Sequence, residues 1–170
     1  MARITILLNR GGGAVAADPQ IAGKVRKAFK AAKMDVRVET IDGGDYEVRC
    51  RAIAKRGDEL LVVGGGDGSI SAAASALARS KTALGILPLG TLNHFARDLG
   101  LPTDIAEAAQ LIARGRKRRV DVAEMNDHIF INNSAIGLYP LMVIDRDQQR
   151  KRLGRSKRPV SYTHLRAHET

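Results

Sequence analysis

The sequence is poor in aromatic residues and cysteine: its 170 residues contain no tryptophan, three tyrosines, three phenylalanines and one cysteine. Proteins that bind single-stranded nucleic acids stack bases on aromatic side chains, so we expect no specific nucleic-acid partner. The single cysteine, Cys50, excludes an intrachain disulfide and fits a reducing, cytoplasmic compartment. No stretch reaches the roughly 18 uninterrupted apolar residues of a membrane span, so any membrane contact is expected to be peripheral.

Acidic residues are also scarce, because 18 aspartates and glutamates stand against 28 lysines and arginines, which gives a net charge of +10. Such a chain attracts polyanions, among them nucleotides, nucleic acids and anionic membranes. The positive charge gathers in "RGRKRR" at 114–119 and "RKRLGRSKR" at 150–158. Each cluster is interpreted as a solvated face or a flexible tail, and for the basic helix predicted over 146–158 a contact with anionic lipid headgroups is the alternative.

Short apolar runs ending in glycine alternate with amphipathic segments through the first 119 residues. The runs predict buried strands, and apolar residues spaced three and four apart predict helices. The predicted strands are 3–10, 35–41, 59–66 and 83–90, and the predicted helices are 18–34, 45–57, 69–80, 91–101 and 104–115. This alternation predicts an α/β fold, with a parallel sheet covered by helices on both faces.

The pattern changes at about 119–120, where we place a domain boundary. Segments 118–126 and 128–137 read as two strands joined by a short turn, which predicts an antiparallel hairpin opening a β-rich second domain over 120–159. Residues 160–170 continue no pattern and are interpreted as a foreign tail. His164 and His168 have helical i, i+4 spacing, but they lie in this tail without a third ligand, so no metal site is expected.

The segment "ELLVVGGGDGSI", from Glu59 to Ile70, ends a predicted strand in glycines and opens a helix. Backbone N–H groups of glycines can approach phosphate oxygens closely, and a helix N-terminus adds positive potential. The spacing matches neither the dinucleotide G-x-G-x-x-G pattern nor the Walker A pattern. Asp67 inside the turn would serve magnesium, an acceptor hydroxyl or a ribose, or would simply cap a helix beginning near Ser69.

Two more strand ends carry glycine and polar side chains. "LLNRGGG" places Asn9 before three glycines, and "LPLGTLN" places Thr91 and Asn93 at a helix start. The carboxyl ends of parallel strands share one edge of a sheet, so three such ends together predict a nucleotide cleft there.

"GGGDGSI" followed by "ILPLGTLNHFARDLGLP" resembles the catalytic domain of the diacylglycerol kinase family, which includes bacterial lipid kinases and sphingosine kinases. The resemblance extends from Ile4 to about Asp147. The G-G-D-G element by itself is shared with NAD kinases and phosphofructokinases, whereas "PLGTLNHFARDLG" selects the lipid-kinase branch. Three positions depart from the family pattern: Arg10 replaces a proline, Leu92 a glycine and His94 an aspartate.

The resemblance implies an ATP-binding domain of a kinase that uses ATP and magnesium to phosphorylate a lipid hydroxyl. It implies that Asp67 orients the acceptor hydroxyl or a magnesium-bound water. It implies nucleotide contacts at Asn9, Arg10, Gly11, Gly12, Gly13, Thr40, Gly65, Gly66, Asp67, Gly68, Ser69, Thr91 and Asn93. The family's second domain supplies the magnesium residues and a catalytic carboxylate. These match no position here, so we expect the chain by itself to have little or no kinase activity.

Two other functions are compatible with these residues. The chain could belong to a kinase of the same superfamily that phosphorylates a soluble substrate such as NAD. Alternatively, the charge of +10 fits a non-catalytic module that binds nucleotides or polyanions.

Overall fold

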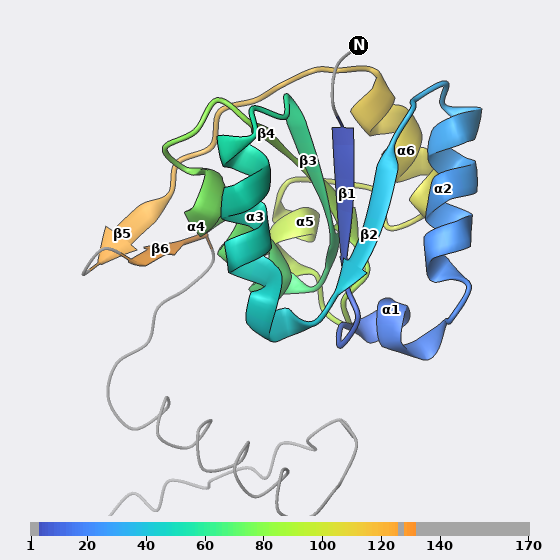
Figure 1. The fold of residues 1–170 in the computed structure, drawn as a ribbon, viewed down its shortest axis with the longest axis horizontal. Coiled ribbons are helices and arrows are strands. Elements are labelled where there is room, and N and C mark those ends of the chain that lie inside the picture. The colour runs from blue at the N-terminus through green and yellow to red at the C-terminus, as the bar shows by residue number, and fades with distance from the viewer. Residues whose placement is uncertain (1–3, 126–127, 132–170) are drawn as a thin grey trace, which may run out of the picture. The chain divides into compact units, whose positions relative to one another are not determined.

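The computed structural model describes residues 4–125 and 128–131 (Figure 1). A four-stranded sheet has the order β2-β1-β3-β4, and every neighbouring pair is parallel. Its strands are β1 (Ile4–Asn9), β2 (Arg37–Ile41), β3 (Leu60–Gly65) and β4 (Ala83–Pro88). The predicted α/β fold with a parallel sheet is confirmed.

Helices cover both faces of this sheet (Figure 1). They are α1 (Gly13–Ala17), α2 (Ile21–Ala31), α3 (Tyr46–Lys55), α4 (Asp67–Leu77), α5 (His94–Asp98) and α6 (Ile105–Ala113), with a 3₁₀ turn, η1, at Gly43–Asp45. Successive side chains of a strand point to opposite faces, so Ile6 and Leu8 of β1 enter one apolar cluster and Leu7 the other. The first cluster lies under α1, α2 and α6, and the second lies under α3, α4 and α5.

Helix α2 shows how the sequence specifies this packing. Ile21, Val25 and Phe29 follow one another at four-residue intervals, and all three are buried. Burial of each such side chain contributes roughly 1.5–3 kcal/mol. The helix ends near Lys33, whose φ of 59° is left-handed.

The first crossover corrects the predicted helix start at Asp18. The short helix α1, which the sequence did not predict, occupies Gly13–Ala17, and Asp18 follows its last residue. The Asp18 carboxylate accepts a hydrogen bond from the Gln20 N–H at 2.9 Å, and α2 begins only at Ile21. Three consecutive glycines suggested a loop, but the third of them is the first residue of a helix.

The predicted hairpin is confirmed, because β5 (Ala123–Met125) pairs antiparallel with β6 (His128–Phe130). Ile131, directly after β6, packs against the second apolar cluster. The domain boundary predicted at 119–120 stays a prediction. The rest of the predicted second domain, the basic segment 150–158, the predicted tail 160–170 and both of its histidines lie outside the described residues. Within residues 4–125 and 128–131, no helix is long and apolar enough to span a membrane.

A two-point ion pair ties β2 to α3. Arg49 of α3 donates from Nε and Nη2 to the two carboxylate oxygens of Glu39, both at 2.7 Å. The Glu39 side chain is only 14% exposed, so water screens this pair weakly. The hydrogen bond from Arg49 lowers the pKa of Glu39 below its ordinary value of 4.5, against the opposing effect of burial.

We expect Glu39→Gln to destabilise the domain by about 1 kcal/mol at neutral pH, since a charge-assisted bidentate pair is replaced by a neutral contact. The pKa of Glu39 is lower in the folded state than in the unfolded state. The ion pair therefore stabilises the fold fully when the pH is above the unfolded-state pKa, and this stabilisation is lost as the pH falls through the folded-state pKa. Urea unfolding at several pH values should therefore show the difference constant above about pH 5.5 and shrinking below about pH 4.5. Glu47→Gln breaks the exposed pair with Arg51 and should change stability by less than about 0.5 kcal/mol. Equal effects of the two substitutions at neutral pH would contradict this interpretation.

Candidate phosphate-binding site at the carboxyl edge of the sheet

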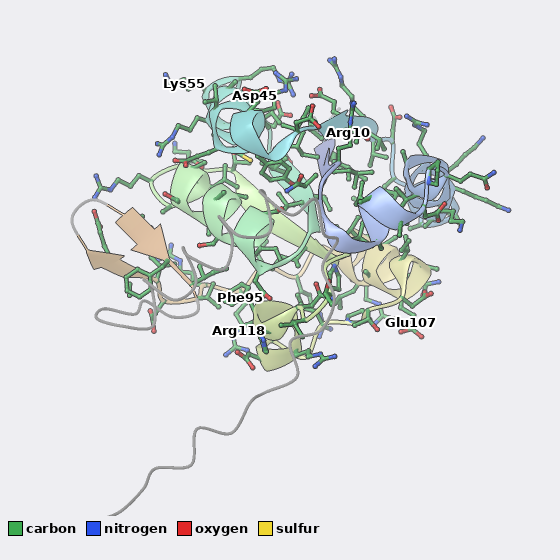
Figure 2. All side chains as sticks on the ribbon, turned by 90° about the horizontal axis from the view of Figure 1, so that it is seen from below. Arg10, Asp45, Lys55, Phe95, Glu107 and Arg118 are labelled. Carbon is green, nitrogen blue, oxygen red and sulfur yellow. The ribbon has the colours of Figure 1, made fainter. Side chains whose placement is uncertain are left out.

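The three glycine-marked strand ends meet at one edge of the sheet, as the sequence predicted. We call residues 9–13, 64–69 and 88–93 together the glycine edge. The strand register places Leu8 opposite Gly64, and Gly65 opposite Pro88. Figure 2 looks onto this edge, with Arg10 on the side of β2 and Phe95 on the opposite side.

The loops of the glycine edge approach each other too closely for larger residues. A Cβ atom on Gly90 would lie 2.3 Å from the Cα of Gly66. A Cβ atom on Gly13, whose φ is +26°, would lie 2.6 Å from the Leu89 carbonyl oxygen. That oxygen accepts a hydrogen bond from the Ala14 N–H at 2.8 Å. Glycine at 13, 66 and 90 therefore allows three separate loops to pack backbone against backbone.

Asn9 connects the first loop to the second. Its side-chain nitrogen donates to the Ser69 hydroxyl at 2.8 Å, and its side-chain oxygen accepts from the Gly11 N–H at 3.1 Å. Ser69 lies in the first turn of α4 and is buried. Asn9 thus fixes the loop after β1 against the start of α4, and both the nitrogen and the oxygen of its side-chain amide take part.

Asn93 determines the shape of the third loop. It is buried and has a left-handed φ of 52°, a conformation that asparagine adopts more readily than most residues. Its oxygen accepts from the Gly90 N–H at 2.9 Å, and its nitrogen donates to the carbonyl oxygens of Pro88 and Gly90 at 3.2 and 3.0 Å. The nucleotide contact predicted for Asn93 stays a prediction, and the structure gives this side chain a role in holding the turn.

Asp67 connects the second loop to α5. Its two carboxylate oxygens accept from the N–H groups of His94 and Phe95, at 3.1 and 3.0 Å, and these are the first two residues of that helix. Helix α4 begins at Asp67 itself, two residues before the predicted start. The alternative that Asp67 caps the helix following it is corrected in its target, since Gly66 is the N-cap of α4 and the Asp67 carboxylate caps α5, 27 residues further along the chain.

The remaining predicted contacts lie around the rim. Arg10 is exposed, with its Nε 3.6 Å from a carboxylate oxygen of Asp42, and its N–H donates to the Ile41 carbonyl at 2.8 Å. Thr40 lies opposite Leu8, one residue before the end of β2. Thr91 is exposed between Gly90 and the buried Asn93. These positions put Arg10, Thr40 and Thr91 at the ends of three different strands, while their contacts with a ligand stay predictions.

The backbone of the glycine edge fits a phosphate group. Helix α4 has Gly66 as its N-cap, and no side chain caps that position. Gly68, in the first turn, is exposed, and a Cβ atom placed on it would meet no atom within 4 Å. N–H groups at the positive end of a helix suit the charge and the size of phosphate oxygens.

Magnesium has no comparable fit among the described residues, which contain no group of three histidine, cysteine, aspartate or glutamate side chains able to hold a metal ion. The magnesium prediction is therefore not assigned to residues. Cys50 is buried, and burial raises the pKa of its thiol to about 12, as expected for an inert thiol.

Sequence reasoning missed two parts of the site. Gly90 was recognised only as part of a motif, although it makes the closest backbone approach of the site. A glycine at the end of a predicted strand and directly before a polar turn is a signal that could have found it. Asp42, the partner of Arg10, belongs to a different strand end, and no local pattern connects the two residues.

These features define a class of α/β domain in which three glycine-marked loops meet at the carboxyl edge of a parallel sheet. Residues 3–125 match the diacylglycerol kinase catalytic domain family. The chain belongs to this family, and the recognition made from "GGGDGSI" and "PLGTLNHFARDLG" is confirmed.

Individual relatives agree with this membership. The chain is 36% identical over 100 residues to a diacylglycerol kinase of Staphylococcus carnosus (strain TM300). This match covers 58% of this chain and 33% of the relative. It is 48% identical over 81 residues to a probable YegS-like lipid kinase of Klebsiella pneumoniae (strain 342), covering 46% of this chain and 27% of the relative. A crystal structure of a diacylglycerol kinase from Bacillus anthracis str. Sterne superposes with a TM-score of 0.66 at 32% identity, over 76% of this chain and 46% of that one. The matched part thus spans about a third of these curated relatives.

Proposed function

We propose that this chain is the ATP-binding domain of a lipid kinase that transfers the γ-phosphate of ATP to a lipid hydroxyl. The convergence of the three loops at the glycine edge carries this proposal, because it places the open start of α4 beside Asn9, Asp67 and Gly90. Family membership supports the kinase reaction, and relatives named as diacylglycerol kinases or lipid kinases support a lipid acceptor.

The residues of the chain would contribute by positioning and by charge. Phosphoryl transfer needs aligned groups and neutralised phosphate charge more than covalent chemistry by the protein. The N–H groups at the start of α4 would bind phosphate oxygens, and the exposed Arg10 side chain would supply positive charge from the end of β1. Bound magnesium would neutralise further phosphate charge. Asp67 would orient the acceptor hydroxyl while its hydrogen bonds hold α5 in place.

Isothermal titration of the 170-residue chain with a non-hydrolysable ATP analogue tests the binding step. We expect saturable one-to-one binding that persists at 0.3 M salt, because a built phosphate site depends less on screened surface charge than a basic patch does. Binding of the analogue that disappears at 0.3 M salt, together with equally salt-sensitive binding of duplex DNA, would instead identify a non-catalytic polyanion-binding module.

The transfer step is tested with radiolabelled ATP and diacylglycerol in mixed micelles. A form extended to the length of the relatives should label the lipid, and the 170-residue chain should give little or no product. Labelling of NAD but not of diacylglycerol by the extended form would contradict the lipid acceptor. Measurable lipid turnover by the 170-residue chain would contradict the proposal that it is inactive by itself.

A further inference from the structure

The four-stranded sheet has two edge strands, β2 and β4. Among the described residues, no further strand pairs with the outer side of β4, which pairs only with β3. The N–H groups of Ala83 and Leu89 donate to β3-side carbonyls, so the odd-numbered residues of this strand face β3. The N–H and C=O groups of Leu84 and Ile86 therefore point away from the sheet, and no backbone hydrogen bond reaches them from residues 4–125 or 128–131.

This edge lies in a groove of about 650 Å³ with apolar walls from both helical layers. Leu111 and Ile112 of α6 line one side, and Leu77 of α4, Phe95 and Leu99 line the other. Leu111 is 38% exposed although it faces this groove. A sheet edge with apolar side chains above and below has the geometry that a further strand needs: free backbone groups in the plane and apolar surface on both faces.

One boundary of the groove is strongly basic. The segment from Arg116 to Arg119 joins α6 to β5, lines the groove, and is fully basic at its four positions. In Figure 1 this connection passes over the end of the sheet where the strands begin, and in Figure 2 Arg118 lies on the same side of the molecule as Phe95. Glu59 is the one acidic residue among the described groove-lining residues. Two copies of this chain would each carry a net charge of +10, so charge repulsion disfavours pairing of two β4 edges.

We propose that the β4 edge is a docking site for an extended peptide strand with an apolar centre and an acidic end. The backbone of the peptide's apolar centre would form hydrogen bonds with the backbone of Leu84 and Ile86. The acidic end of the peptide would form ion pairs with Arg116–Arg119. A lipid chain fits the walls but cannot bond to the outward N–H and C=O groups, which would lose their water without compensation. The unpaired backbone thus favours a peptide over a lipid as the occupant.

The test uses fluorescence anisotropy with the full chain and a labelled peptide of three glutamates followed by Val-Thr-Val-Ile-Val. Two control peptides share its length: one has lysines in place of the glutamates, and the other is N-methylated at alternate residues of the apolar part. We expect the acidic peptide to bind, and each control to bind at least about tenfold more weakly, since each loses either charge attraction or strand hydrogen bonds.

Two pairs of variants locate the site. Leu84→Pro removes the outward N–H without removing a bond to β3, and it should weaken binding about tenfold, whereas Leu84→Ala, which keeps that N–H, should weaken binding less than about threefold. Arg118→Glu with Arg119→Glu should weaken binding by at least about tenfold, whereas the same charge change at exposed Arg26 and Lys27 of α2 should leave it unchanged. Unfolding curves of all four variants check that each is folded.

Several results would overturn the proposal. Equal affinity for the glutamate and lysine peptides would show that the site does not recognise an acidic end. Equal affinity for the N-methylated peptide and the unmethylated acidic peptide would show an apolar contact without strand pairing. Self-association of the chain that Leu84→Pro abolishes would identify a second copy as the occupant. Binding of oleate at the groove that excludes the acidic peptide would identify a lipid site instead.

Discussion

Replacing Gly90 by alanine is expected to abolish measurable ATP binding and to destabilise the domain by about 3 kcal/mol. The added Cβ would lie 2.3 Å from the Gly66 Cα and 2.8 Å from the Asn93 side-chain oxygen. The first contact is with backbone, which cannot move aside as the end of a flexible side chain can. This clash is relieved only if the loop after β4 moves away from the loop after β3. That movement would also separate the groups proposed to hold phosphate. Urea unfolding and titration with the non-hydrolysable ATP analogue measure the two effects.

Two other glycine substitutions serve as controls, because they separate stability from binding. A Cβ on Gly23 or on Gly68 would meet nothing within 4 Å, and both glycines lie in helices. Alanine at either position should stabilise the domain by about 0.5–1 kcal/mol through its higher helix propensity. Gly23→Ala should leave ATP affinity unchanged. Gly68→Ala should lower it at least about tenfold, since its methyl group would occupy the space proposed for a phosphate oxygen.

The combination of results decides whether the glycine edge is the nucleotide site. A Gly68→Ala variant that is more stable and still binds ATP normally would contradict phosphate binding at the start of α4. A Gly90→Ala variant as stable as the unchanged chain would contradict the backbone packing described here. Neither result could be explained by unfolding, because both variants would be folded.

Much of the fold could be predicted from local sequence patterns. Ile6 and Leu8 alternate with Leu7 on opposite faces of β1, and Ile21, Val25 and Phe29 repeat every four residues, so period and burial agree in each element. The failures are at chain reversals. Helix α1 was missed because its first residue is a glycine after two others, and its position depends on the Ala14 bond to Leu89, 75 residues away in sequence. No pattern within α1 contains that information.

In the candidate site, as in the fold, local patterns predicted the positions of residues but not the contacts between distant segments. Asn9, Gly65 and Asn93 were identified because each stands at or just beyond the end of a predicted strand, and the register brings those ends together. Their interactions were not predictable, since each joins segments distant in sequence: Asn9 binds Ser69, and Asp67 binds the backbone of α5. The sequence thus located the polar residues, whereas the structure showed that several of them hold the loops to one another.

Replacing Asp67 by alanine is expected to slow lipid phosphorylation at least about 100-fold in a form extended to the length of the relatives. The substitution removes the proposed orienting carboxylate and both hydrogen bonds to the N–H groups of His94 and Phe95. Loss of two charge-assisted bonds should also destabilise the chain by about 2–3 kcal/mol. Radiolabel transfer measures the first effect, and urea unfolding of the 170-residue chain measures the second.

Asp104 provides a matched control within the same domain. Its carboxylate accepts from the N–H groups of Ala106 and Glu107 at 2.8 and 3.0 Å, so it caps α6 as Asp67 caps α5, but it lies outside the glycine edge. Asp104→Ala should lower stability by about 1 kcal/mol and leave the transfer rate unchanged. If both alanine variants slow transfer equally, the effect of Asp67 is a general loss of stability and the role proposed for it is wrong.

Asparagine at position 67 separates the two parts of its role. Its amide keeps one oxygen that can accept a bond from α5, but it carries no charge and cannot accept a proton. If Asp67 acts only by holding α5, Asp67→Asn should recover most of the stability and most of the rate lost in the alanine variant. We expect stability to recover in part and the rate to stay low, because an acceptor hydroxyl needs a charged oxygen beside it. Recovery of both would assign Asp67 to positioning alone, and the orienting group for the acceptor would then have to come from another residue.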